Sequence, residues 1–168
     1  MSTLLPPMRR IVTSHNEQRQ AIVAHDSQIS TEIPPQGAGT VLIWSSSESP
    51  ADVASADDKA LADTGFVNNG SIFRIVDLPP KSVGPLHRSI SLDYIIVQKG
   101  TVTLTLDDGS RTKANEGDVV IQQATMHGWT NETDEWARIL AIMLPAKAPV
   151  FGGNELQTDL AALFEAGN

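Results

Sequence analysis

The stretch HRSISLDYIIVQKGTVTLTLDDGSRTKANEGDVVIQQATMHGWTN, residues 87–131, decides the fold of this chain. Short β-prone segments follow one another in it, separated by turn signals at Gly100, at Asp107-Asp108-Gly109 and at Gly117. Residues 101–106 alternate threonine with apolar side chains, as a half-buried strand does. Short strands joined by tight turns predict an antiparallel sheet that closes into a barrel or jelly roll.

Two histidines, His87 and His127, stand near the two ends of this stretch. Asp93 follows His87 by six positions, so on one extended strand the two side chains would point to the same face. A barrel that brings both imidazoles and the carboxylate together would form either an acid/base site or a metal site. We predict His87, His127 and Asp93 as the catalytic residues, although a single histidine on a barrel strand is more often a hydrogen-bonded core residue.

Four further residues are predicted to bind a substrate in the same interior. Ser89 is in phase with the first histidine and the aspartate, and its small polar side chain leaves room for a ligand. Trp129 and Asn131 are in phase with the second histidine, although a tryptophan there could also be plain core. Gln122 ends an apolar run, where a buried amide would either orient a substrate or satisfy backbone groups.

The rest of the chain is predicted as further strands, one loop and one helix. Residues 45–70, rich in Ser, Ala, Asp and Asn, are the least strand-like segment and are predicted to form a loop or a lid over the barrel mouth. From Asn154, a possible cap, apolar residues at helical spacing predict a C-terminal helix over about 154–165. The predicted strands are 10–13, 21–24, 40–44, 72–78, 93–98, 101–106, 111–114, 119–122, 127–131 and 137–144.

The length and composition suit one soluble domain. A chain of 168 residues with 40% hydrophobic residues can bury a core. It has no cysteine, which excludes disulfides, thiolate metal ligands and cysteine nucleophiles. The net charge of −8 argues against nucleic acid or an anionic membrane as a partner. No apolar run is long enough for a secretion signal or a membrane span, so we expect a cytoplasmic protein.

The same residues resemble the cupin family. Its first motif joins a glycine, a pair of histidines one residue apart, an acidic residue and a second glycine. The matching residues here are Gly84, His87, Asp93 and Gly100. Its second motif joins a Gly-Asp pair to a histidine and then an asparagine. The matching residues here are Gly117, Asp118, His127 and Asn131.

The resemblance covers about residues 71–144, and strings such as RRIVTSHN and RIVDLPP extend it toward small single-barrel cupins, some of which accompany natural-product pathways. It implies an all-β fold, the double-stranded β-helix or jelly-roll barrel, as a single domain over 1–168. The core barrel would span 71–144, with an N-terminal strand extension over 9–70 and the short C-terminal helix. It also implies a homodimer, in which N-terminal strands could cover the sheet edge of the neighbour.

Two departures from the family pattern concern the metal. The second histidine of the first motif is replaced by Ser89, and the glutamate by Asp93. A full cupin metal site uses three histidines and a glutamate. His87, Asp93 and His127 still match a two-histidine, one-carboxylate set that can hold a single divalent Fe, Mn, Ni or Zn ion. The cofactor prediction is therefore either none or one such ion.

Three functions fit these observations. The first is a small-molecule enzyme of the lyase or isomerase type, which would use the histidines and Asp93 for dehydration, decarboxylation or cyclisation. The second is a metal-dependent cupin, a dioxygenase or isomerase, that uses the same three residues as ligands. The third is a module that binds a small ligand without catalysis. We expect an enzyme acting on a small molecule, with the lyase or isomerase favoured over an oxidoreductase.

Overall fold

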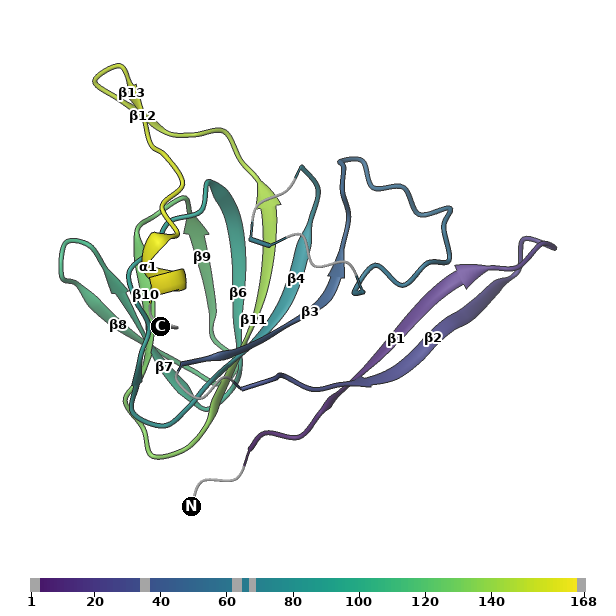
Figure 1. The fold of residues 1–168 in the computed structure, drawn as a ribbon, viewed down its shortest axis with the longest axis horizontal. Helices are drawn as coiled ribbons and strands as arrows, with labels where there is room; N and C mark the ends of the chain where they lie inside the picture. The colour runs from purple at the N-terminus through teal and green to yellow at the C-terminus, as the bar shows by residue number, and fades with distance from the viewer. Residues whose placement is uncertain (1–3, 34–36, 62–64, 67–68, 166–168) are drawn as a thin grey trace.

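The computed structural model describes residues 4–33, 37–61, 65–66 and 69–165. Two antiparallel sheets face each other and form the barrel in Figure 1. In spatial order, the five-stranded sheet contains β3 (Gly39–Ser45), β4 (Ile72–Leu78), β11 (Ala137–Pro145), β6 (Ser91–Lys99) and β9 (Val119–Gln123). The four-stranded sheet contains β5 (Ser82–Val83), β10 (His127–Asn131), β7 (Thr101–Leu106) and β8 (Arg111–Asn115).

The hydrophobic core lies between the two sheets and follows from the alternation of the strands. On β6, Ile95 and Val97 point inward, and on β11 Ile139 and Ala141 lie opposite them and are also buried. The four-stranded sheet adds inward-facing side chains, of which Trp129 on β10 is the largest. Side chains at every second position of a strand share a face, so the alternating pattern read from the sequence places these residues inside.

Gly100 makes the tight turn between β6 and β7. Its φ of +78° lies in the left-handed region, and an added Cβ would come within 3.2 Å of the backbone oxygen of Trp136. Both the conformation and the space favour glycine at this position. This turn folds β7 away from β6 into the opposite sheet, which begins the closure of the barrel.

An N-terminal hairpin extends away from the barrel, as Figure 1 shows. It consists of β1 (Met8–His15) and β2 (Ala21–Ile29), which pair with each other and with no other named strand. The hairpin confirms the predicted N-terminal strand extension. The homodimer and the single domain over 1–168 stay predictions.

All ten strands predicted from the sequence lie within observed strands. The helix is shorter than predicted, because α1 covers only Ala161–Glu165. Instead of helix, the residues from Asn154 begin with a small hairpin of β12 (Val150–Phe151) and β13 (Asn154–Glu155), which turns through two glycines with positive φ. Asp159 then forms an isolated bridge with Arg88, and this extended pairing delays the helix to Ala161.

Among the described residues, no helix has the length and the apolar character that crossing a bilayer requires.

Candidate active site in the barrel interior

His87 and His127 lie directly opposite each other on neighbouring antiparallel segments. Each backbone N–H donates to the carbonyl of the other, at 2.9 and 3.0 Å, in an isolated β-bridge. Two residues paired in this way carry their side chains on the same face of the sheet. The ring centroids are 4.4 Å apart, and the ring planes are tilted by 55°. The structure therefore brings the two predicted imidazoles into contact.

Backbone carbonyls set the tautomer of both rings. Nδ1 of His87 is 3.0 Å from the carbonyl oxygen of Pro85, and Nδ1 of His127 is 2.9 Å from that of Thr125. A carbonyl oxygen can only accept, so Nδ1 must carry the proton in each ring. In the neutral form of each ring, the lone pair is then on Nε2, the atom that can act as a base or as a metal ligand.

Gln122 links the second histidine to Asp93. Its Nε2 is 3.1 Å from Oδ2 of Asp93 and 3.2 Å from Nε2 of His127, and its Oε1 accepts the indole N–H of Trp129 at 3.1 Å. Indole nitrogen can only donate, so Trp129 fixes the orientation of the amide and turns its NH₂ group toward His127 and Asp93. These four side chains are buried, each at most 7% exposed.

Asp93 is a buried carboxyl group, and one of its oxygens has no hydrogen-bond partner among the described residues. It is 4% exposed, and its Oδ1 accepts no hydrogen bond from the described residues. Burial raises the pKa of Asp93 above its usual value, while Ser91, Gln122 and the charge of His87 act in the opposite direction. A buried carboxyl group with a raised pKa and one oxygen free of hydrogen bonds is suited to donate or accept a proton.

The route that brings His87 and Asp93 together differs from the predicted one. His87 pairs with β10 of the four-stranded sheet, whereas Asp93 belongs to β6 of the five-stranded sheet. The chain crosses between the sheets around Ser89, so the two residues do not share one strand. Ser89 is 4% exposed, and its hydroxyl is 2.7 Å from that of Ser91. Ser89 thus lies in the interior as predicted, and Ser91, which is in phase with it, is buried there too.

Asn131, predicted to bind substrate, is instead occupied by the backbone. It is fully buried, its Nδ2 donates to the carbonyls of Leu78 at 3.1 Å and Glu135 at 2.7 Å, and its Oδ1 accepts from the N–H and the hydroxyl of Thr133. All four hydrogen-bonding positions of the amide are used. We therefore correct this prediction, because Asn131 holds the turn after β10 and has no donor or acceptor left for a substrate.

Arg74 is an interior residue that the sequence reasoning missed. It is 3% exposed and lies on β4 opposite Ala141 of β11, on the face that carries the core. Its Nη2 donates to the carbonyl of Gly65 at 2.7 Å, and its guanidinium lies 4.9 Å from the ring centroid of Phe66. A signal was available, since Arg74 is in phase with the apolar Ile72 and Leu78 on the same strand.

The predicted metal ligands do not fit a metal ion in this arrangement. Among the described residues, no group of three or more His, Cys, Asp and Glu side chains is placed so that it could hold a metal. The amide of Gln122 lies between two of the three predicted ligands, His127 and Asp93. Each of these contacts is about 1 Å longer than a bond to a divalent metal.

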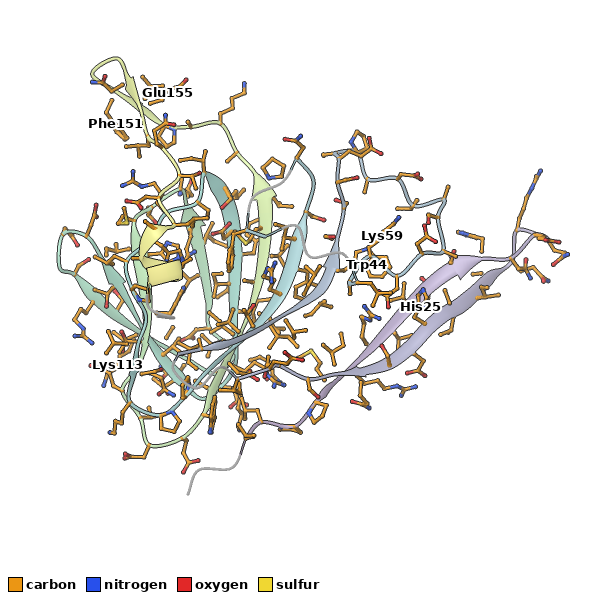
Figure 2. All side chains as sticks on the ribbon, viewed as in Figure 1. His25, Trp44, Lys59, Lys113, Phe151 and Glu155 are labelled. Atoms are coloured by element: carbon orange, nitrogen blue, oxygen red, sulfur yellow. The ribbon has the colours of Figure 1, made fainter. Side chains whose placement is uncertain are left out.

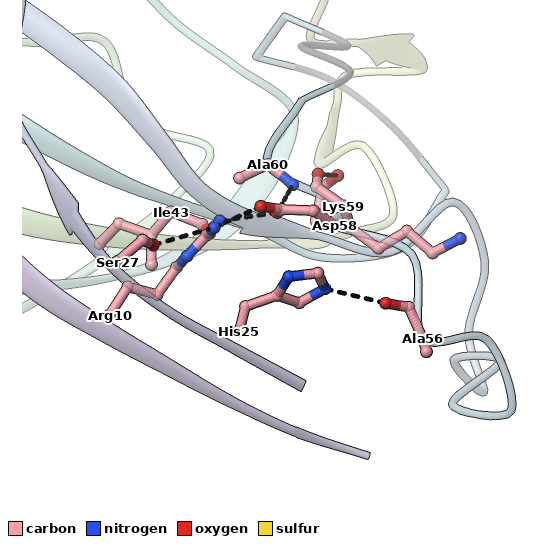
Figure 3. Close-up of polar contacts among 9 residues, drawn as sticks. Arg10, His25, Ser27, Ile43, Ala56, Asp58, Lys59 and Ala60 are labelled. Carbon is pink, nitrogen blue, oxygen red and sulfur yellow. Dashed lines mark hydrogen bonds and ion pairs between the residues drawn. The ribbon is translucent and has the colours of Figure 1, made fainter. Parts of the chain in front are cut away.

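The segment predicted as a lid lies mainly elsewhere. Figure 3 shows that Arg10 of β1 pairs with Asp58 and that His25 of β2 contacts Ala56. Nε2 of His25 is 2.8 Å from the carbonyl oxygen of Ala56. These contacts tie the loop after β3 to the N-terminal hairpin, and Figure 2 places Trp44 and Lys59 in the same region. Arg10, Trp44, Ala56, Asp58 and Lys59 are among the residues that line a cavity of about 760 Å³, and none of the seven predicted site residues lines it.

Phe66 of the lid segment does lie near the barrel interior. It packs on Leu42, Ile72 and Met143, and Met143 pairs with Asp93 across β11 and β6. The remaining space beside Phe66 and Ser91 is about 10 Å³, room for at most one water molecule. The lid prediction is thus wrong for the loop that contacts the hairpin. Residues 62–64 and 67–68 lie outside the described residues.

The buried imidazole of His127 predicts a loss of stability in acid. The pKa of His127 is lowered from 6.5 to about 4, chiefly by burial; the hydrogen bond to Thr125 raises it in part, and the charge of nearby His87 adds a smaller lowering. Between these two values the unfolded chain binds more protons than the folded chain, so the free energy of unfolding falls as the pH falls. We expect this residue to account for a decrease of about 2–3 kcal/mol between pH 7 and pH 4.

Urea unfolding at a series of pH values measures this effect. The matched variant His127→Gln keeps a polar side chain but cannot titrate, so its stability should fall less steeply over the same range. Equal slopes for the two proteins would show that His127 is not the group responsible.

Known proteins resemble this chain over most of its length. Residues 74–143 match the family model described as a cupin domain. The chain is 30% identical to a cupin-domain-containing oxidoreductase, srdD, of Neurospora crassa, over 95% of this chain and 88% of that protein. It is also 30% identical to phomopsin biosynthesis cluster protein D of Diaporthe leptostromiformis, over 82% of this chain and 78% of that protein.

A solved structure shares the fold alone. The cupin domain of Cnp3 from Schizosaccharomyces pombe superposes with a TM-score of 0.51 at 8% identity, over 82% of this chain and 87% of that domain. This likeness agrees with the barrel of two facing sheets.

Proposed function

Because this chain belongs to the cupin family, whose members among its relatives include enzymes and proteins of fungal biosynthetic clusters, we propose that it is a small-molecule enzyme of natural-product metabolism. Its chemistry would be proton transfer of the lyase or isomerase type. The observation that carries this proposal is the reciprocal bridge between His87 and His127: Nε2 of His87 has no hydrogen-bond partner among the described residues, and the charge of this ring acts on the buried carboxyl of Asp93.

The two histidines differ in what they can do. His127 is 4% exposed, and its Nε2 already faces the NH₂ group of Gln122. His87 is only partly buried, and no described residue forms a hydrogen bond with its Nε2. We therefore assign the role of general base to His87, because its lone pair is free and a proton can reach solvent from it. His127 would orient the amide of Gln122 and line the site without taking part in proton transfer.

Asp93 supplies the complementary acid. With its pKa raised by burial, the carboxyl can carry a proton near neutral pH more readily than an exposed aspartate. In a dehydration, Nε2 of His87 would take the proton from the carbon beside a substrate carbonyl, and Asp93 would give its proton to the leaving hydroxyl, which departs as water. Transfer of the proton from the imidazolium to the carboxylate would restore both groups. In an isomerisation, the proton would return to another carbon of the substrate.

Hydrogen exchange with solvent tests this function class. The purified protein would be incubated in D₂O with a panel of small carbonyl compounds, half of them carrying a β-hydroxyl group, and the products analysed by mass spectrometry. We expect deuterium on the carbon beside the carbonyl, or loss of one water, for at least one structural class in the panel. Turnover that neither places deuterium on the carbon beside the carbonyl nor removes water would exclude a mechanism that begins with proton removal.

The second candidate function is an oxidoreductase. It is favoured by the name of the Neurospora relative, which is 30% identical over 88% of its length. An oxidation would change the hydrogen or oxygen content of the substrate and would consume an oxidant. Measuring dissolved oxygen, and the absorbance of added nicotinamide or flavin, in the same incubations separates this function from proton transfer.

A further inference from the structure

We propose that the side-chain amide of Gln122 occupies the position that a metal ion would need, and that it keeps the cluster of His127, Asp93 and His87 in a metal-free form. Removing this one amide should free that position for a metal ion, and a carboxylate in its place should add a third ligand once its side chain turns aside from that position. The inference rests on the proposed function only in treating this cluster as the functional site.

The NH₂ group of Gln122 contacts the same lone pairs of His127 and Asp93 that a bound cation would contact. A metal ion draws lone pairs from an imidazole and a carboxylate at the same time. The NH₂ group of Gln122 offers two hydrogens, one to the lone pair on Nε2 of His127 at 3.2 Å and one to Oδ2 of Asp93 at 3.1 Å. The same two ligand atoms are thereby satisfied without a charge.

The spacing of the cluster fits an amide and not a metal ion. If the two N–H bonds of the amide diverge by about 120°, the two acceptor atoms are about 5.5 Å apart. Two ligands on opposite sides of a divalent ion are about 4.2 Å apart at most. The histidine and the aspartate would therefore have to approach each other by more than about 1 Å, and the amide stands between them.

Neighbouring residues hold the amide in this place. Gln122 on β9 lies directly opposite Asp93 on β6 in the strand register, so the backbone sets the distance between the two residues. The indole N–H of Trp129 fixes the oxygen end of the amide at 3.1 Å. Because Trp129 comes from β10 in the opposite sheet, the amide is held from both sheets and cannot turn its acceptor toward His127 without breaking this bond.

Gln122 therefore acts on the site as a positioning residue. Its NH₂ group donates to the lone pair on Nε2 of His127, so of the two rings only His87 keeps an Nε2 lone pair without a hydrogen bond from the described residues. This explains on physical grounds why a chain that retains two histidines and a carboxylate from a metal motif has no arrangement of three ligands among its described residues.

Cobalt binding tests the inference, because Co²⁺ bound by imidazole and carboxylate has visible absorption that a structural change in the protein would not produce. The experiment titrates CoCl₂ into chelator-treated, full-length wild type, Gln122→Glu and Gln123→Glu, with calorimetry and absorption as readouts. The Gln123 control adds the same charge one residue away, on an exposed side chain at the outer face of β9. We expect Gln122→Glu to bind one Co²⁺ per chain with an affinity on the order of 100-fold above that of wild type. Gln123→Glu should behave like wild type.

Two further variants keep the result decisive. Adding His127→Ala to Gln122→Glu should remove the gained binding, which shows that the imidazole is a ligand. If Gln122→Glu does not fold, Gln122→Ala removes the amide without adding charge and should also bind Co²⁺ more tightly than wild type. Stoichiometric binding by wild type as tight as that of Gln122→Glu, or no difference between the Gln122 and Gln123 variants, would overturn the inference.

These measurements need no substrate. A failure of the proton-transfer assay would therefore leave the cobalt result valid, and a failure of the cobalt experiment would leave the role of His87 as a base untouched.

Discussion

Replacing Arg138 with alanine is expected to lower the free energy of unfolding by about 3–5 kcal/mol, the largest stability effect that the structure predicts. Arg138 on β11 and Asp77 on β4 are 3% and 2% exposed, and the guanidinium donates from Nε at 2.5 Å and from Nη2 at 2.7 Å to the two carboxylate oxygens. Without Arg138, a buried carboxylate loses its countercharge and two charge-assisted hydrogen bonds.

The same pair connects the N-terminal segments to the barrel. Nη1 of Arg138 donates to the carbonyl of Pro6 at 2.9 Å, and the hydroxyl of Thr31 donates to Asp77 at 2.5 Å. Urea unfolding should therefore show the loss in a single transition. Such a result would also support the prediction that residues 1–168 form one domain.

A matched control separates burial from the loss of an arginine. Arg9 makes an equally bidentate pair with Asp26, but the two side chains are 60% and 47% exposed. Arg9→Ala should change the stability much less, because water screens exposed ion pairs. The double variant Arg138→Met with Asp77→Leu should recover most of the lost stability, since an apolar pair leaves no buried charge. Equal losses for Arg138→Ala and Arg9→Ala would contradict the assigned role of the buried pair.

Replacing His87 with glutamine is expected to lower turnover by about 10²–10⁴-fold, the size of effect that a general base contributes. Glutamine can keep a hydrogen bond to the backbone, as Nδ1 of His87 does to Pro85 at 3.0 Å, but it has no lone pair that takes up a proton near neutral pH. The loss should be in kcat more than in KM, because proton removal occurs only in the transition state.

The assay compares this variant with His15→Gln, which changes an exposed histidine at the end of β1. Turnover of a compound found active in the D₂O panel would be followed for both variants, with their circular dichroism as a check of folding. His15→Gln should keep wild-type turnover. A His87→Gln protein that folds and retains full activity would remove His87 from the mechanism and leave Asp93 as the remaining candidate for the base.

The strands and the family were predictable from the sequence because both depend on local patterns. Alternation with a period of two marks a strand whatever the rest of the chain does, and Gly100 marks a turn because its backbone needs a positive φ. The motif residues from Gly84 to Asn131 likewise lie at fixed spacings that a reader can match. For these reasons the ten predicted strands were found in the structure, and the resemblance agreed with the comparisons.

The roles of the site residues were less predictable, because a hydrogen-bond partner comes from elsewhere in the chain. Gln122 and Asn131 are both amides in predicted interior strands, and nothing local tells them apart. The structure surrounds Gln122 with a histidine, a carboxylate and an indole, and Asn131 with backbone groups. In the same way, only the paired strands reveal that Arg138 meets Asp77 across the sheet.

The sequence by itself determined where the strands run and that they close into a cupin barrel, and it predicted two histidines and an aspartate as the functional residues. Only the tertiary structure decided how those three residues meet, because the chain crosses from one sheet to the other between His87 and Asp93, and strand parity does not continue through such a crossing. It also decided that an amide stands among them, since register between β6 and β9 is set by the packing of the whole barrel and not by either strand alone.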